Sequence, residues 1–179
     1  MSENILLVGS GAREHSIAKA IDRSTNLNHI FCLASNMNPG IASLCKEFIV
    51  DDFNDPETVS SYATKNNISM AVIGPENPLQ NGVVDSLWNL GVGVVGPKKD
   101  LAQIETSKTF TRNLLKKHNI PGGPKYKTFI SLDGVQDFLK ELDENYVVKF
   151  DGLAGGKGVK VSGDHLSSHE EALEYCKDL

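Results

Sequence analysis

Lysines and glycines are concentrated in residues 146–161, and this combination suits the binding of phosphate groups. Two strand-like runs flank the loop 151–158, although a two-residue turn would suffice to join them. Glycines in that number cost backbone entropy, so they indicate that the main chain approaches a ligand closely or moves. Backbone N–H groups, together with the charges of Lys149 and Lys157, would then bind phosphate oxygens. The glycines of the loop are Gly152, Gly155, Gly156 and Gly158.

Two alternatives compete with this interpretation of the loop. A Walker A loop needs Ser or Thr after its Gly-Lys pair and then a helix, whereas Lys157 is followed by Gly158 and a β-branched strand. A glycine-rich hairpin whose lysines only face solvent needs no ligand, and short patterns of this kind also arise by chance. The residues argue against the first alternative and leave the second open.

A second set of candidate side chains follows two apolar runs in the first half of the chain. One run ends at Gly9-Ser-Gly-Ala-Arg-Glu-His15 and the other at Gly74-Pro-Glu-Asn-Pro-Leu79. A glycine turn at a helix start suits one phosphate group, and an arginine can bind phosphate through a forked contact. The stiff second loop would aim a carboxylate at donors such as sugar hydroxyls. The candidate substrate-binding residues are Gly9, Gly11, Arg13, Glu14, Gly74, Glu76 and Asn77.

Each charged candidate also has a simpler explanation. Arg13 could form a surface ion pair, and Glu14 could add a favourable charge to a first helical turn. Glu76 could be an exposed loop acid, and His15 is better explained as a capping or packing residue than as a base, because no partner is visible.

The first loop also has the beginning of a dinucleotide-binding pattern, GxGxxG. Gly9 and Gly11 fit this pattern, but Glu14 stands at the third glycine position. The second strand ends in Leu-Ala-Ser-Asn36, without the acidic residue that would bind an NAD ribose. A conventional NAD site is therefore disfavoured.

The elements that would position these residues alternate between strands and helices. Apolar runs typical of buried parallel strands span 4–8, 29–34, 48–50, 70–73 and 92–95, and helical patterns lie after His15, at 56–65 and at 83–90. This alternation predicts an α/β fold with a doubly wound, Rossmann-like parallel sheet. Ligands of such sheets bind beyond the carboxyl ends of the strands, where three loops are expected, 9–15, 36–41 and 74–79.

The pattern changes after the last of these strands. Helical stretches at 100–105 and 107–118 lead into Asn119-Ile-Pro-Gly-Gly-Pro124, which breaks any helix and predicts a domain junction. Beyond it we expect a strand at 125–129, a helix at 131–142, the glycine-rich hairpin and a helix from residue 168. The predicted domains are 1–120 and 121–179. Because the second is short for a complete α/β unit, we expect the chain to be a fragment.

Composition disfavours several classes of function. A net charge of −5 does not indicate the positively charged surface that nucleic-acid binding requires. No apolar run approaches the roughly 18 residues of a membrane helix, and the acidic N-terminus predicts no signal peptide. Cys32, Cys45 and Cys176 form no CxxC pair, so reduced, partly buried thiols are expected rather than a disulfide framework or a zinc site. A cytoplasmic protein with neither membrane nor nucleic-acid partners is the resulting expectation.

Several motifs occur together in one order along the chain. They span residues 8–15, 73–79, 95–97, 104–110 and 148–159. This set resembles the phosphoribosylamine–glycine ligase (glycinamide ribonucleotide synthetase) family along essentially the whole chain. The hairpin, with its sequence Val-Lys-x-Asp-Gly-Leu-Ala-x-Gly-Lys-Gly-Val, resembles the phosphate-covering loop of the wider ATP-grasp superfamily.

The resemblance implies a specific reaction of purine biosynthesis. ATP would convert glycine to glycyl phosphate, and 5-phosphoribosylamine would then attack it to give glycinamide ribonucleotide, ADP and phosphate. The first domain would be a pre-ATP-grasp domain that binds phosphoribosylamine through the residues named above. The second would be part of an ATP-grasp small α+β subdomain. Lys149, together with Lys108 of the Ser-Lys segment, would contact the nucleotide phosphates, and Gly155, Gly156, Lys157 and Gly158 would fold over them.

The resemblance also implies ATP and Mg²⁺ as cofactors. The magnesium ligands and the adenine and glycine contacts are expected beyond Leu179, so no metal ligand and no catalytic residue is assigned here. The chain alone is accordingly predicted to be inactive.

The sequence departs from the family pattern at a few positions. Ala12 stands where a third glycine is usual, and Gly155 stands where alanine is common. The loop after the second strand is one residue longer than usual, which leaves the roles of Asn36 and Asn38 open.

Three alternatives to the glycine ligase remain. Another ATP-grasp carboxylate ligase, of the biotin carboxylase or formate-dependent purine enzyme type, would share the lysines, but the loops 9–15 and 74–79 match the glycine ligases better. An NAD-binding oxidoreductase and a non-catalytic nucleotide-binding module come from other classes. The sequence predicts neither the oligomeric state nor a fusion to other purine enzymes.

Overall fold

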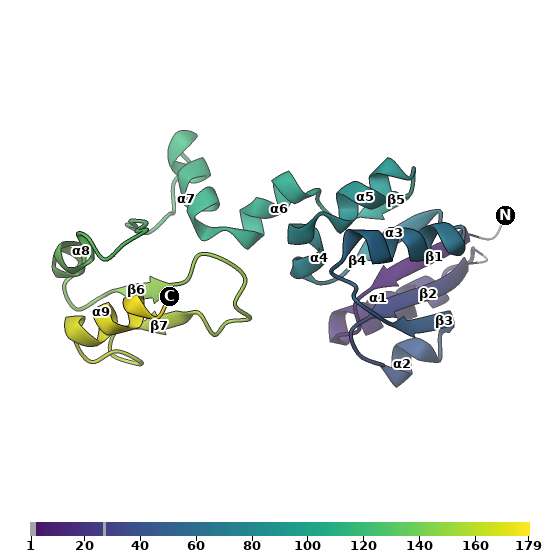
Figure 1. Ribbon diagram of the computed structural model, residues 1–179, viewed down its shortest axis with the longest axis horizontal. Helices are drawn as coiled ribbons and strands as arrows, with labels where there is room; N and C mark the ends of the chain where they lie inside the picture. The colour runs from purple at the N-terminus through teal and green to yellow at the C-terminus, as the bar shows by residue number, and fades with distance from the viewer. Residues whose placement is uncertain (1–2, 27) are drawn as a thin grey trace. The chain divides into compact units, whose positions relative to one another are not determined.

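A computed structural model of the chain describes residues 3–26 and 28–179 (Figure 1). The chain forms two compact units that divide between Gln103 and Ile104. The domain boundary predicted between residues 120 and 121 remains a prediction. None of the described helices has the length and apolar character needed to cross a membrane.

The first unit is built on a parallel sheet. Its strands, β1 (Glu3–Val8), β2 (Asn28–Ala34), β3 (Cys45–Val50), β4 (Met70–Ile73) and β5 (Gly93–Val95), lie in the order β3-β2-β1-β4-β5. Val8 pairs with Leu33 on one side and with Ile73 on the other, so three strands end at the same level. The loops that follow them are therefore neighbours. The predicted doubly wound α/β fold is confirmed.

Helices cover both faces of this sheet. On one face, α3 (Pro56–Lys65) and α5 (Val83–Asn89) pack on a core that includes Leu6, Val8 and Leu33. On the other face, α1 (Ala12–Asp22) and α2 (Pro39–Ala42) pack on a core that includes Leu7 and Cys32. The consecutive residues Leu6, Leu7 and Val8 are all fully buried, because a central parallel strand is covered on both sides.

Local signals fix the ends of several helices. Asp55 accepts a hydrogen bond from the Thr58 N–H and caps α3, which begins at Pro56 as predicted. Gly82, with φ of 90°, lies between α4 (Glu76–Asn81) and α5, and only a left-handed residue can turn the chain there.

The second unit has a smaller core. Its elements are α7 (Lys108–Lys117), α8 (Val135–Leu142), the antiparallel hairpin of β6 (Val147–Lys149) and β7 (Val159–Val161), and α9 (His169–Lys177), while α6 (Lys99–Thr106) spans the division. Val135, Leu139, Tyr146, Leu166 and Ala172 form the core. The predicted glycine-rich hairpin is confirmed, with slightly shorter strands.

Some predicted elements were wrong. Residues 125–129 are not a strand, and the helix expected from residue 131 begins only at Val135. The segment 125–129 has strand-like residues but no pairing partner among the described residues, so no ladder forms. The segments after β2 and β4, expected as loops, contain the short helices α2 and α4.

Candidate functional site

Two loops meet at the carboxyl ends of β1 and β4. The N–H of Gly9 donates to the carbonyl of Leu33, and the N–H of Gly74 donates to the carbonyl of Val8, each at 3.0 Å. Gly9 has φ of 110°, and a Cβ there would lie only 2.8 Å from Cδ of Pro75. Glycine is therefore required at position 9 by its conformation and by its contact with the second loop.

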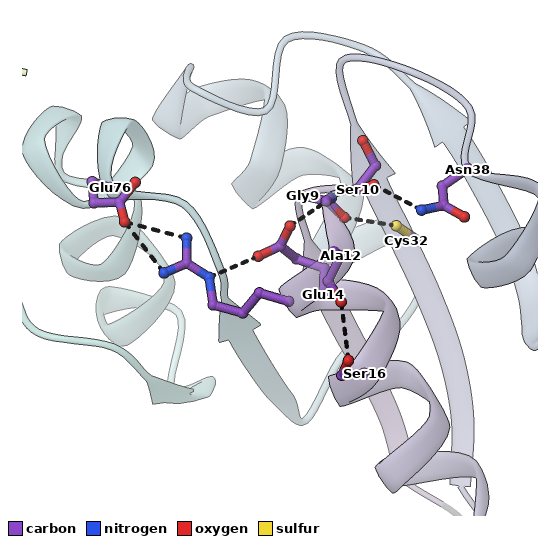
Figure 2. Close-up of polar contacts among 10 residues, drawn as sticks. Gly9, Ser10, Ala12, Glu14, Ser16, Cys32, Asn38 and Glu76 are labelled. Carbon is purple, nitrogen blue, oxygen red and sulfur yellow. Dashed lines mark hydrogen bonds and ion pairs between the residues drawn. The ribbon is translucent and has the colours of Figure 1, made fainter. Parts of the chain in front are cut away.

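The carboxylate of Glu14 lies between these loops and is buried (Figure 2). One oxygen, Oε2, accepts a 2.6 Å hydrogen bond from the N–H of Gly11, the residue that precedes α1. The other, Oε1, accepts from Nε of Arg13 at 3.2 Å. The space beside Gly74 is filled by this same carboxylate. Glu14 thus contacts the glycine loop, the arginine and the second loop.

Arg13 connects the loops through a second carboxylate. Both of its terminal nitrogens donate to Oε1 of Glu76 at 3.2 Å. Figure 2 draws these contacts as dashed lines to Glu76. Glu76 begins α4 and its side chain is 41% exposed, whereas that of Glu14 is 5% exposed. Hydrogen bonds to Glu14 and then to Glu76 raise the pKa of Arg13, so the guanidinium stays charged.

The loop after β2 also contacts the glycine loop that follows β1. Nδ2 of Asn38 donates to the carbonyl of Ser10 at 2.9 Å, and its Oδ1 caps α2. The thiol of Cys32 lies beneath the loop, 3.5 Å from the carbonyl of Gly9. His15 packs against Gly40, which agrees with the packing role expected for it.

The structure therefore assembles nearly all the candidates of the first unit. Gly9, Gly11, Arg13, Glu14, Gly74 and Glu76 form one cluster, and Asn77 follows it as an exposed residue of α4. The N–H groups of Ala12 and Arg13 have no intrahelical acceptor, because they begin α1. The cluster can offer an anion these N–H groups and one guanidinium, and it can offer hydroxyl donors the carboxylate of Glu76.

In the second unit, Lys108 is joined to the base of the glycine-rich loop. Its Nζ donates to the carbonyl of Gly152 at 2.8 Å, although the two residues lie 44 positions apart. The carboxylate of Asp151 accepts from the N–H groups of Lys108 at 2.7 Å and of Thr109 at 3.2 Å. The hydroxyl of Ser107, which caps α7, also donates to Asp151. The start of the loop is thus tied to the start of α7.

Asp151 was not among the candidate residues, although it lies within the motif. Burial raises the pKa of its carboxyl, but hydrogen bonds from the first turn of α7, chiefly from Thr109, outweigh burial and lower the pKa. Asn38 was noted in the sequence, but its contact with the glycine loop could not be predicted from the sequence. The hydrogen bond from Asn38 to Ser10 and the bonds from α7 to Asp151 join residues distant in sequence, so no local pattern predicts them.

The rest of the loop is held by few hydrogen bonds. The N–H of Phe150 donates to the carbonyl of Gly158 at 2.8 Å, and the N–H of Lys157 donates to the carbonyl of Ala154 at 2.9 Å. Lys149 is the last residue of β6 and is exposed, as are Gly155, Gly156 and Lys157, whereas Gly158 is buried. Gly155 and Gly156 have positive φ, which other residues adopt only with strain.

Metal ligands are not gathered in the part of the chain that the structure describes. No three His, Cys, Asp or Glu side chains there are grouped so that they could hold an ion. The described residues therefore do not by themselves fit a complete magnesium site.

The fold and these loops define an α/β protein of the ATP-grasp class. Residues 3–105 match the N domain of phosphoribosylglycinamide synthetase, and residues 106–179 match the ATP-grasp (A) domain of the same family. The chain belongs to the phosphoribosylglycinamide synthetase family.

Relatives with the name phosphoribosylamine–glycine ligase match nearly the whole chain. The protein of Methanosphaera stadtmanae is 46% identical over 175 residues, which are 98% of this chain and 39% of that protein. The protein of Methanocaldococcus jannaschii is 47% identical over 179 residues, which cover 98% of this chain and 40% of that protein. The chain thus spans about 40% of the length of these relatives.

Solved structures share the fold at lower identity. Phosphoribosylamine–glycine ligase of Thermotoga maritima superposes with a TM-score of 0.72 at 24% identity, over 96% of this chain and 38% of that one. N5-carboxyaminoimidazole synthetase of Staphylococcus aureus, solved with ADP, gives a TM-score of 0.73 at 16% identity, over 98% of this chain and 45% of that one. These structures support the fold assignment alone.

Proposed function

We propose that this chain supplies the phosphoribosylamine site and part of the ATP site of a phosphoribosylamine–glycine ligase. The reaction joins glycine to 5-phosphoribosylamine, with ATP converted to ADP and phosphate through glycyl phosphate. The observation that carries the proposal is 46% identity to a ligase of that name over 98% of the chain. Cys32, Cys45 and Cys176 are free thiols, as is usual in a reducing compartment, so we propose the cytoplasm as the location of the protein.

The first unit would bind phosphoribosylamine at the cluster of Arg13 and Glu76. The phosphate would lie at the start of α1, where the first N–H groups are unpaired and the helix dipole favours an anion. Arg13 would add a forked, charge-assisted contact. Glu76, freed from Arg13, would accept hydrogen bonds from the ribose hydroxyls.

The second unit would bind the phosphates of ATP. Lys108 and Lys149 would neutralise phosphate charge, and the loop 155–158 would cover the phosphates with its N–H groups. The exposure of Lys149 and Lys157 and the positive φ of Gly155 and Gly156 fit this role. ATP supplies the phosphoryl group that activates the glycine carboxylate, while the protein positions the reactants and neutralises charge.

An NAD-binding oxidoreductase fits the first unit less well. The dinucleotide-binding pattern has a third glycine so that its helix can pack closely against the strand. Here Glu14 occupies that position, and its carboxylate fills the space between the loops. Other ATP-grasp ligases share the fold, but their motifs match the loops 9–15 and 74–79 less well than those of the glycine ligases.

Thermal unfolding in the presence of separate ligands tests the proposal. Ribose 5-phosphate, a stable analogue of phosphoribosylamine, should raise the Tm of the protein, since a ligand at 100 times its Kd adds about 2.7 kcal/mol to the stability of the folded state. The shift should be clearly smaller in Arg13→Ala, because the forked contact is lost while the N–H groups at the start of α1 remain. ATP with Mg²⁺ should act separately, and Lys108→Ala should reduce its effect.

The outcomes separate the candidate functions. A shift with NAD and none with ribose 5-phosphate would overturn the proposal in favour of a dinucleotide fold. Release of ADP dependent on glycine from the 179-residue chain alone would contradict our expectation that these residues do not complete the reaction.

A further inference from the structure

Glu14 is a buried acid at the centre of a cluster that is proposed to bind an anion. Its side chain is 5% exposed, and both carboxylate oxygens accept hydrogen bonds, one from Gly11 and one from Arg13. A buried carboxylate is costly unless it is paired, and here it also adds negative charge near the phosphate. Direct binding of a phosphate by Glu14 is therefore excluded by charge, and its contacts indicate another role.

The contacts of Arg13 divide its guanidinium into two edges. Nε is held by the buried Glu14, while both terminal nitrogens face the half-exposed Glu76. Only the terminal edge can exchange its partner for a ligand without exposing an unpaired buried charge. Glu76 marks the direction in which this edge points (Figure 2).

We propose that Glu14 is a positioning residue, which fixes the Nε edge of Arg13 so that the terminal nitrogens present a forked contact to the phosphate of the substrate. This inference rests on the proposed phosphoribosylamine site. It assigns Glu14 a role through Arg13, in place of the direct substrate contact that the motif suggested.

The glycines around Glu14 support this assignment. A Cβ at Gly11 would lie 2.7 Å from Oε2, and a Cβ at Gly74 would collide with Oε1. Gly74 lacks the positive φ that would otherwise explain a glycine. The two loops thus fit closely around the carboxylate, in the position where Oε1 accepts from Nε of Arg13.

A double-mutant cycle tests the inference on the native protein. Glu14→Gln keeps the volume of the side chain, but its amide can accept only one of the two hydrogen bonds through oxygen. Affinity for ribose 5-phosphate, measured by isothermal titration calorimetry, should fall about tenfold, which is the scale of one charge-assisted hydrogen bond. In an Arg13→Ala background, Glu14→Gln should change that affinity less than about twofold. The glutamine oxygen can still accept from the N–H of Gly11, while its NH₂ group would face Nε of Arg13, so thermal stability should fall more in the native background than in the Arg13→Ala background.

Each outcome of the cycle distinguishes a role of Glu14 through Arg13 from a role that does not involve Arg13. An equal loss of affinity in both backgrounds would overturn the inference, because Glu14 would then act without Arg13. If the native protein fails to bind ribose 5-phosphate, the proposed function itself fails and this role fails with it.

A second variant leaves Glu14 intact in case its substitution prevents folding. Arg13→Lys keeps the positive charge but removes Nε and the forked edge. Its affinity should fall about as far as that of Arg13→Ala. Affinity equal to the native value in Arg13→Lys would show that orientation by Glu14 is irrelevant.

Discussion

The carboxylate of Glu14 fills the space that a side chain at residue 74 would need. Gly74→Ala should therefore destabilise the protein by about 2 kcal/mol, as expected for overpacking of a site that cannot expand. The backbone at Gly74 permits alanine, so the cost comes from the collision alone. Chemical denaturation of the variant and the native protein measures the difference.

Two controls separate this collision from the general effect of replacing glycine. Gly93→Ala adds a Cβ that would meet only the carbonyl of Ser69, at an ordinary 3.7 Å, and should leave stability nearly unchanged. In a Glu14→Ala background the effect of Gly74→Ala should shrink, because the colliding carboxylate is absent. Undiminished destabilisation in that background would contradict the steric explanation.

At the scale of residues, the sequence predicted that several candidates lie in neighbouring loops, as they do in the structure, but it did not predict their partners. Gly9, Arg13, Glu14 and Glu76 were candidates because of their spacing around predicted strand ends. The ion pair of Arg13 with Glu76 joins residues 63 positions apart, and only the register of β1 against β4 brings them together. The contacts of Asp151 were not predicted because they, too, join residues that are far apart in the sequence.

Among the elements, α3 depends on a titratable cap. Hydrogen bonds from the hydroxyl and the N–H of Thr58 lower the pKa of Asp55 in the folded state. A lowered pKa means that ionised Asp55 stabilises the fold above its unfolded pKa of about 3.9. This contribution is lost as pH falls through the lower, folded pKa.

Asp55→Asn isolates that contribution, because asparagine caps a helix about as well as aspartate but does not titrate in this range. The two proteins should have similar unfolding midpoints at neutral pH. Below about pH 4 the native protein should lose stability more steeply than the variant. Parallel midpoint curves down to pH 2.5 would show that the Asp55 cap does not contribute to acid sensitivity.

Residues 153–157 should be the most mobile part of the hairpin, because they lie beyond the residues of the loop that are bonded to α7. Asp151 and Gly152 are tied to α7, whereas residues 153–157 have mainly the Ala154–Lys157 turn. Amide hydrogen exchange in 153–157 should therefore be faster than in β6 and β7, and ATP with Mg²⁺ should slow it. Exchange as slow as in the strands without nucleotide would contradict this expectation.

Elements with a strong periodic pattern were predictable, and those that depend on a partner were not. β1 is predictable from its apolar run, and α3 is predictable from the Asp-Pro pair at its start. Residues 125–129 have strand-like composition, yet a strand forms only where another strand can pair with it. The short helices α2 and α4 were missed because four to six residues are too few to show a helical period.

For the molecule as a whole, the two units have separate cores of unequal size. The first unit has core clusters on both faces of its sheet, whereas the second has one cluster around Leu139 and Tyr146. A small core leaves less stability after the entropy cost of folding is met. The second unit should therefore unfold at a lower temperature than the first.

The single tryptophan of the chain, Trp88, lies in α5 and reports on the first unit alone. Lys98 Nζ lies 5.2 Å from the centre of its ring, so unfolding of this unit should change the fluorescence. Circular dichroism at 222 nm reports helices of both units, and should show an earlier transition that fluorescence lacks.

Matched core substitutions assign the two transitions. Leu139→Ala and Leu33→Ala each remove a buried side chain, at a cost of about 2–5 kcal/mol. Leu139→Ala should lower only the earlier dichroism transition and leave the fluorescence midpoint unchanged, whereas Leu33→Ala should lower the fluorescence midpoint. If Leu139→Ala shifts both signals together, the chain unfolds as one cooperative unit. The stability of the glycine-rich hairpin would then depend on the whole molecule instead of on the small core of the second unit.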